Sequence, residues 1–334
     1  MFNRIRPYQI TLFVCAAYLL LTLLTHSGDS RVFVTIGACF AECSGGTSCT
    51  IGPENGYDGQ FSFYIARDPA HAAPCIDVPA YRYQRILLPI MGRLLAFGVE
   101  DFIPLAFVAI NLFALVASTW LLESLLAAQK VSRVYALAYG LFGGLVIAVR
   151  LSTSEPLAYG LCLLALWLGQ EIEPPRRQEH QDVGAQRAAP TPYWRIWGIP
   201  IALALAALAK ETTLLFAGAF TLYYLAQRRW LDALRTALIA GLPFALWQLY
   251  LYNWLGAFGV GSGGAGGTPF EIIPFNGILR ILTEGSLSAF LLLAPIALLV
   301  AALPALWGLI ASARELWRER GGAHPAPCVL LVNA

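Results

Sequence analysis

An aspartate set between two glycines has the surroundings that most favour chemistry. Asp58 follows Gly56 and precedes Gly59 and Gln60, and the aromatic run at 61–66 suits a helix lying at a membrane interface. Glycine permits the tight turn that such a position needs. A carboxylate just ahead of a helix is most often an N-cap or turn residue. The alternative is general-base catalysis, in which the carboxylate takes a proton from an acceptor hydroxyl.

Four arginines give this alternative weight. Arg67, Arg82, Arg85 and Arg150 fall in or beside stretches that we place on the same side of the membrane as Asp58. Guanidinium groups pair well with phosphate. Anchoring to lipid headgroups or pairing with nearby carboxylates would explain these arginines equally well.

Two further polar clusters precede short apolar runs. Ser-Thr-Ser-Glu-Pro at 152–156 contains Glu155 and has the composition of a helix start, where backbone N–H groups favour anions. Lys210 and Glu211 stand between two apolar runs. They could simply solvate a turn, but ionisable groups within membrane segments are functional candidates by default. We expect both clusters to face the same cavity as Asp58.

One class of reaction suits a cavity that offers a carboxylate, several cations and access from a bilayer: transfer from a lipid-linked donor. Its donor is a lipid-linked phosphate and its acceptor is a hydroxyl. Cations can stabilise the phosphate that leaves, and phosphate needs less acid assistance than an alkoxide, so one carboxylate could suffice. No dense cluster of acidic residues predicts a metal, and we expect neither a metal nor another cofactor. The basic residues form no stripe, so no nucleic-acid partner is expected.

Membrane helices must position these residues. The chain has 334 residues, of which 58% are hydrophobic and 13% charged, whereas a soluble domain carries about a quarter charged residues. We predict an all-α fold, a polytopic membrane helix bundle that forms a single integral membrane domain over residues 1–334. The first apolar run is predicted to be an uncleaved helix rather than a signal peptide, because no cleavage site closely follows it. About eight runs are candidate transmembrane segments, at 8–24, 102–122, 135–149, 157–168, 198–209, 212–226, 234–254 and 286–310.

The distribution of basic residues orients these segments. When the run at 198–226 is split at Lys210, 14 of the 22 Lys and Arg fall on the cytoplasmic side, as the positive-inside rule requires. If residues 198–226 formed one helix instead, the excess of Lys and Arg on the cytoplasmic side would disappear. We therefore predict a multi-pass protein of the cytoplasmic (inner) membrane with both termini in the cytoplasm. The connections are a first extracytoplasmic loop at 25–101 with interfacial helices, a cytoplasmic linker at 169–197 and a Gly-rich extracytoplasmic loop at 255–285.

Several segments are too short to cross a bilayer fully. The run at 198–209 has 12 residues, about 18 Å of helix, against a hydrocarbon core of about 30 Å. Helix ends at that depth need polar partners and are tolerated where they line a wet cavity. Short outward-facing helical hairpins therefore predict a cavity open to the outside, where the active face would lie.

Cysteines mark the first loop as a candidate disulfide-bearing segment. Four of the seven cysteines fall in it, at Cys39, Cys43, Cys49 and Cys75. An oxidising space favours disulfides, and two bridges are expected, with three pairings open. A zinc site is the rival interpretation, because the first two have a suitable spacing. The irregular placement of the others favours disulfides. We expect Cys15 and Cys162, which lie in apolar segments, to pack in the core.

Three motifs in the first loop read Tyr-Asp-Gly-Gln-Phe at 57–61, Ala-Arg-Asp-Pro at 66–69 and Tyr-Arg-Tyr-Gln-Arg at 81–85. With Ser-Glu-Pro and Ala-Lys-Glu-Thr ahead of two short segments, they resemble bacterial polytopic proteins of the GT-C glycosyltransferase superfamily. The topology match covers most of the chain and the local motifs about 30 residues. Unlike many members, the chain has no second acid beside Asp58 and ends soon after its last apolar run.

The resemblance implies a large first outer loop and transfer of a sugar from a polyprenyl-phosphate-type lipid donor. The acceptor is a hydroxyl on a glycan, lipid or protein, and membrane lipid is the other expected partner. Asp58 matches the acidic base position of the family. Arg85, Lys210 and Glu211 correspond to the donor phosphate region.

Two other classes of function fit the same features. A transporter or lipid flippase needs access from both sides, and the segment lengths contain no inverted repeat. A non-catalytic assembly protein would use the two outer loops as interaction surfaces. The sequence favours sugar transfer, with Asp58 as base. The substrate-binding candidates are Gln60, Arg67, Arg82, Arg85, Arg150, Glu155, Lys210 and Glu211.

Overall fold

The structure is a computed structural model that describes residues 5–40, 56–172, 193–262 and 287–299, with a few single positions between 283 and 310. Helices make up the regular structure of these ranges, and only an isolated bridge between Ile36 and Gly56 pairs extended backbone there. The predicted all-α class is thus confirmed for the described part. Its residues fall into two compact units. The first runs up to Leu214 and resumes from Leu238 to 262, and the second takes Leu215–Ala237 and the residues from 287 onward.

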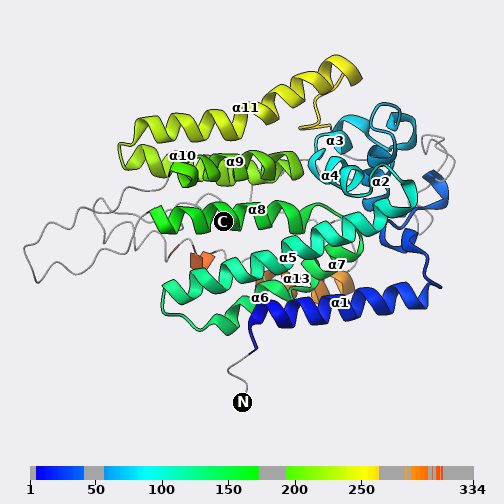
Figure 1. Ribbon diagram of the computed structural model, residues 1–334, viewed down its shortest axis with the longest axis horizontal. Coiled ribbons are helices and arrows are strands. Elements are labelled where there is room, and N and C mark those ends of the chain that lie inside the picture. Colours follow the sequence, from blue (N-terminus) through cyan, green and yellow to red (C-terminus); the bar gives the residue numbers. More distant parts are fainter. Residues whose placement is uncertain are drawn as a thin grey trace, which may run out of the picture. The chain divides into compact units, whose positions relative to one another are not determined.

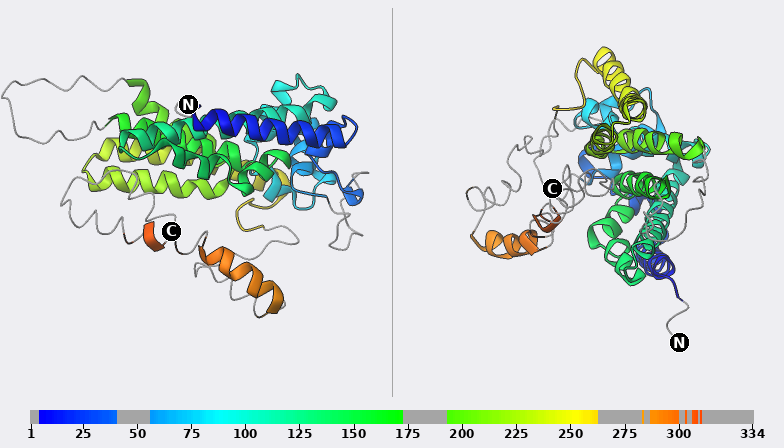
Figure 2. Two further views of the ribbon diagram at one scale, coloured as in Figure 1. Left: turned by 90° about the horizontal axis from the view of Figure 1, so that it is seen from below. Right: turned by 90° about the vertical axis from the view of Figure 1, so that its left-hand side faces the viewer.

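Four long helices lie side by side in the first unit (Figures 1 and 2). Each packs on the next, in the order α1 (Pro7–Thr25), α5 (Ile103–Ala128), α8 (Glu155–Ile172) and α9 (Tyr193–Ala209). The contact of α5 with α8 is close, because a Cβ on Gly160 would lie 2.7 Å from the Ser118 hydroxyl oxygen. Between α5 and α8 the chain forms η7 (Arg133–Ala136), α6 (Leu137–Gly140) and α7 (Gly143–Arg150).

The described residues between α1 and α5, at 26–40 and 56–102, gather at the end of this bundle where α5 begins (Figure 1). The helix expected at 61–66 is confirmed as α2. Its surroundings differ from the prediction, because Phe61, Phe63 and Ile65 are buried and Phe61 meets the Phe40 ring edge-on at 5.0 Å. Aromatic packing inside the protein therefore replaces the expected interfacial position. The elements are η2 (Ser30–Phe33), η3 (Ala38–Phe40), α2 (Gly59–Arg67), η5 (Ala73–Cys75), α3 (Pro79–Tyr83), α4 (Leu87–Leu95) and η6 (Glu100–Phe102).

The predicted break at Lys210 is confirmed. Helix α9 ends at Ala209, and Lys210 has extended backbone with φ −156° and ψ 121°. The chain then forms η8 (Glu211–Thr213) and α10 (Leu214–Ala226). A single unbroken helix over 198–226 is excluded. The remaining helices are α11 (Trp230–Leu255) and α13 (Leu287–Ala297).

The described part of the chain contains fewer candidate membrane-spanning helices than the sequence predicted for the whole chain. Within the described residues, three helices are long and apolar enough to cross a membrane: Pro7–Thr25, Glu100–Ala128 and Trp230–Leu255. A fourth span results if Arg133–Gly140 and Gly143–Arg150, bent by 49° at their junction, count as one. The sequence prediction gave about eight spans because it included apolar runs that form only short helices. With 17 and 13 residues, α9 and α10 extend only about 25 and 20 Å.

Large apolar side chains cover the outside of the long helices. Phe13 and Leu24 of α1 are 75% and 67% exposed, and Phe113 of α5 is 75% exposed. Apolar surface of this extent is covered by a membrane or a partner. Cys15 and Cys162 are buried free thiols, which confirms their predicted place in the core. The described part thus fits a helical membrane protein.

One predicted connection is shorter than expected, and another starts where it was predicted. Helix α8 continues to Ile172 and α9 begins at Tyr193, so helices enter the linker predicted at 169–197 from both sides. Helix α11 ends at Leu255, at the start of the predicted Gly-rich loop. Residues 173–192 and the glycine run after 262 lie outside the described residues, as does most of the segment predicted at 286–310.

A buried carboxylate ties the start of α1 to α5. The Glu123 side chain is 2% exposed, and its Oε1 lies 2.6 Å from Nη1 of Arg6 and 3.8 Å from Nη1 of Arg133. We predict that Arg6→Ala lowers the unfolding free energy by about 1–3 kcal/mol, because it leaves a buried charge poorly paired. Arg31→Ala removes exposed pairs and should cost less than about 1 kcal/mol. Thermal unfolding in detergent compares the two, and equal losses would contradict this role of Glu123.

Candidate active site

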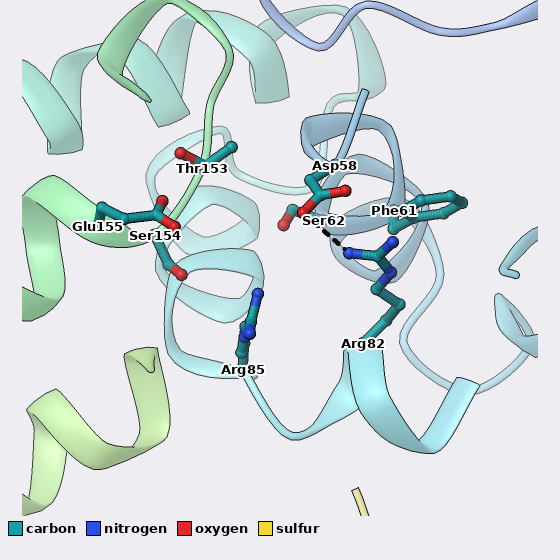
Figure 3. Close-up of a pocket in the computed structure, with 8 residues that line it drawn as sticks. All are labelled: Asp58, Phe61, Ser62, Arg82, Arg85, Thr153, Ser154 and Glu155. Atoms are coloured by element: carbon teal, nitrogen blue, oxygen red, sulfur yellow. Dashed lines mark ion pairs between the residues drawn. The ribbon is translucent and has the colours of Figure 1, made fainter. Parts of the chain in front are cut away.

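A narrow polar pocket lies where the first loop meets the start of α8 (Figure 3). It holds about 20 Å³ of free space, room for about one water-sized group. Figure 3 shows Asp58 and Arg82 on one side and Glu155 on the other, with Arg85 reaching in between them. The lining residues are Asp58, Phe61, Ser62, Arg82, Arg85, Thr153, Ser154 and Glu155.

Two glycines place Asp58 at this pocket. Gly56 has φ +69°, and its missing side chain leaves room for the Gly37 and Thr35 backbone. A Cβ on Gly59 would lie 2.2 Å from the Leu151 carbonyl oxygen, so the start of α2 presses directly on the turn before α8. Asp58 occupies the N-cap position of α2, but its side chain makes no capping hydrogen bond. The plain N-cap interpretation therefore does not explain this carboxylate.

Arg82 joins two carboxylates on one side of the pocket. Its Nη1 lies 3.0 Å from Oδ2 of Asp58. Its Nε and Nη2 donate to both oxygens of Asp77, at 2.9 and 2.8 Å. The guanidinium also lies over the Phe61 ring, 4.3 Å from its centroid. Burial opposes its charge, but the contacts with Asp77 and Asp58 outweigh burial and raise the Arg82 pKa. Arg82 is thus a fixed cation that holds Asp58 in place.

Contacts on the other face of α3 hold this arginine in position. The Tyr83 hydroxyl donates to the Pro69 carbonyl oxygen at 2.8 Å, and Nε1 of Trp247 in α11 donates to the Tyr83 carbonyl oxygen at 2.8 Å. Gly259 lies against Ala80 and Gln84 with no room for a Cβ. Since Tyr83 directly follows Arg82, these contacts fix the direction in which Arg82 leaves the helix.

Arg85 pairs with a residue distant in sequence. Its Nε and Nη2 donate to the two carboxylate oxygens of Glu211 at 2.9 and 2.7 Å. Nη2 also donates to the Tyr81 hydroxyl at 2.7 Å, and the guanidinium lies 4.6 Å from the Tyr81 ring centroid. Both partners of the ion pair are less than a fifth exposed. This two-bond geometry is the one in which arginine binds a carboxylate or a phosphate.

Lys210 reaches the start of α8. Its Nζ lies 2.5 Å from Oε1 of Glu155. The turn that carries Glu155 is fixed by buried Asn111, whose Nδ2 donates to the Thr153 carbonyl oxygen at 2.9 Å. Helix α8 begins at Glu155, which confirms the helix start predicted from residues 152–156. The break in the chain at Lys210 thus delivers a cation to the pocket wall.

The charges of this site nearly balance. Among the described residues, four carboxylates (Asp58, Asp77, Glu155 and Glu211) form ion pairs with three cations (Arg82, Arg85 and Lys210). The cluster carries one more negative than positive formal charge. Each of the three cations is therefore already paired with a carboxylate.

Five of the eight predicted binding residues do not line the pocket. Lys210 and Glu211 pair with the lining residues Glu155 and Arg85, and the other three lie apart from it. Gln60 is 1% exposed, and its Oε1 accepts a hydrogen bond from Gly37 N–H at 2.9 Å, so it supports the loop instead. Arg67 lies over the Tyr64 ring and 3.7 Å from Glu100. Arg150 ends α7 without lining the pocket.

Asp77 is one of the nearby carboxylates that the sequence offered as partners for the arginines, and it does pair with Arg82. Three other residues escaped the sequence analysis: Tyr81 holds Arg85, and Ser62 and Asn111 shape the pocket or the turn behind it. The spacing of Asp77 and Arg82 across the start of a short helix was the available signal for that pair. Asn111 gave none, because a single amide in an apolar segment has many roles.

Metal and disulfide predictions remain open. No group of three or more His, Cys, Asp or Glu side chains suited to a metal occurs within the described ranges. Cys43 and Cys49 lie outside these ranges. The pairing of the four loop cysteines therefore stays a prediction.

Comparison with known proteins does not decide the family. The chain matches no family model, no curated protein and no solved structure.

The pair formed by Glu211 and Arg85 predicts a pH dependence of stability. Burial opposes ionisation of Glu211, but the hydrogen bonds and charge of Arg85 outweigh burial, so the pKa of this carboxyl is lowered. The unfolded chain protonates a glutamate near pH 4.3. The contribution of the pair is therefore complete above about pH 4.3 and is lost as the pH falls through the lowered pKa.

We predict that Glu211→Gln unfolds at a lower temperature than wild type at pH 7 and that the gap closes below about pH 4. Thermal unfolding in detergent from pH 7 to pH 3 measures it. The control is Glu100→Gln, which removes a more exposed carboxylate with contacts of 3.7 and 3.9 Å. A gap of constant size at every pH would show that Glu211 acts through shape rather than charge.

Proposed function

We propose that this protein transfers a sugar from a polyprenyl-phosphate-type lipid donor to a hydroxyl acceptor, with Asp58 as the general base. The observation that carries the proposal is the pocket itself, in which a half-exposed carboxylate without a capping role faces two arginines. The GT-C resemblance predicted an acidic residue at this position. Sequence motifs and pocket geometry thus support the same residue.

The chemistry is a single displacement. The acceptor oxygen attacks the anomeric carbon of the sugar while the bond from that carbon to the donor phosphate oxygen breaks. The electron pair leaves with the phosphate, and the hydroxyl proton passes to Asp58. Because one displacement occurs, the configuration at the sugar carbon inverts. Arg82 holds Asp58 through Oδ2 and supplies positive charge beside the reacting groups.

A lipid donor is supported by an apolar cavity beside the polar pocket. This cavity has a volume of about 510 Å³ and is lined by residues of α4, α5 and α8. Leu157 lines this cavity, and Glu155, two residues earlier in α8, lines the polar pocket. The cavity offers room for the apolar chain of such a donor within the same unit as the pocket.

The orientation belongs to the same proposal. The pocket would lie on the extracytoplasmic face of the cytoplasmic membrane, and the distribution of Lys and Arg supports this orientation. On that face the four loop cysteines would lie in an oxidising space, which favours disulfides over zinc.

Asp58→Asn tests the proposed base, because it keeps size while removing the proton acceptor. Membranes containing the full chain are incubated with a panel of polyprenyl-phosphate sugars, and glycosylated products are measured by mass spectrometry. We predict that the variant loses about 10²–10⁴ in rate and retains donor binding.

Asp68→Asn is the matched control, because Asp68 is an exposed carboxylate of the same loop that pairs with His71. It should transfer sugar at the wild-type rate. Wild-type transfer by Asp58→Asn would overturn the proposed base. Lipid or sugar flux without any covalent product across the panel would indicate a transporter instead.

A further inference from the structure

Two arginines converge on one buried carboxylate near the end of α5, away from the polar pocket. Arg6 immediately precedes α1, and Arg133 begins η7, which packs on both α1 and α5. The Nη1 atoms of the two arginines lie 2.6 and 3.8 Å from the same oxygen, Oε1 of Glu123. The two guanidinium groups are therefore held close to each other.

The single carboxylate offsets only one of these two positive charges. The Glu123 side chain is 2% exposed, whereas the Arg6 and Arg133 side chains are 50% and 48% exposed. The contact between Arg133 and Glu123 is longer than a hydrogen bond, so this carboxylate takes none of the N–H donors of Arg133. Lys130, exposed in the turn between α5 and η7, adds a further cation. Like charges held together repel each other, so this part of the surface favours an external anion.

These cations lie at the level where a membrane surface is expected. Two of the candidate spans are Pro7–Thr25 and Glu100–Ala128, and the cations lie at the start of the first and just beyond the end of the second. Large apolar side chains stand next to them in sequence, since Ile5, Val134 and Tyr135 are 58%, 56% and 64% exposed. Cations beside exposed apolar side chains at the ends of membrane helices suit the headgroup and the acyl chains of a phospholipid.

We propose that Arg6, Lys130 and Arg133 form a binding site for an anionic phospholipid. The headgroup phosphate accepts hydrogen bonds from the half-exposed guanidinium groups, and the acyl chains lie along the neighbouring apolar side chains. Glu123 holds the two guanidinium groups together, so it positions the site and does not bind the lipid itself. The site is independent of sugar transfer, because it shares no residue with the lining of the polar pocket.

Lipid binding to the full chain tests this site. Phosphatidylglycerol, which is anionic, and phosphatidylcholine, which has no net charge, are each titrated into the protein in an uncharged detergent. Native mass spectrometry measures the bound lipid. Phosphatidylglycerol should bind more tightly than phosphatidylcholine. Lys130→Gln and Arg133→Gln should each weaken phosphatidylglycerol binding about 5-fold, because each removes one cation beside the headgroup, and should leave phosphatidylcholine binding unchanged.

Arg31→Gln is the matched control, because Arg31 is 54% exposed and pairs with Glu100 and Asp101 at the other end of α5. It should bind phosphatidylglycerol like the wild type. Arg133→Lys keeps the positive charge and should retain most of the affinity. Lys130 is exposed, so Lys130→Gln tests the site even if Arg133→Gln does not fold.

Equal affinity of the wild type for the two lipids would overturn the proposal, as would unchanged phosphatidylglycerol affinity in a folded Lys130→Gln. Glycerol 3-phosphate, which carries the headgroup charge without acyl chains, serves as a competitor and should displace phosphatidylglycerol poorly. Displacement at equal concentration would also contradict the proposal, because it would show that a soluble anion binds as well as the lipid.

Discussion

Pairing of buried charges decides how the first loop meets the helices. A charge taken out of water is tolerated only with a partner of opposite sign and good geometry. Arg85 therefore holds Glu211, and Lys210 holds Glu155, across 126 and 55 residues of sequence. These bonds bring together the first loop, the turn after α9 and the start of α8. The break at Lys210 follows from the same constraint, because extended backbone there sends the ammonium group to Glu155.

The same pairing gives the pocket its chemical character. A site with freely available cations would collect any anion, whereas here each cation already has a carboxylate partner. A ligand that enters this pocket therefore meets cations whose charge is already offset by carboxylates. The pocket's free volume of about 20 Å³ leaves room for about one water-sized group.

The sequence predicted local features better than it predicted partners. The helix at 61–66, the helix start at Glu155 and the break at Lys210 each follow from short-range rules of turns, caps and charge distribution. The direction in which a side chain points does not follow from such short-range rules. Gln60 follows Asp58 closely in sequence, yet it turns inward to bind Gly37, while Asp58 faces Arg82. Within the described residues fewer helices than predicted are long enough to span a membrane, because apolar composition does not reveal where a helix ends.

The account depends most on Asp58 as the carboxylate at which the acceptor reacts. A structure of the full chain in lipid nanodiscs, determined by electron cryomicroscopy with a bound polyprenyl-phosphate sugar, tests it directly. We predict density for the sugar beside the Asp58 carboxylate, which Arg82 holds in place. A sugar bound away from Asp58 would contradict the account.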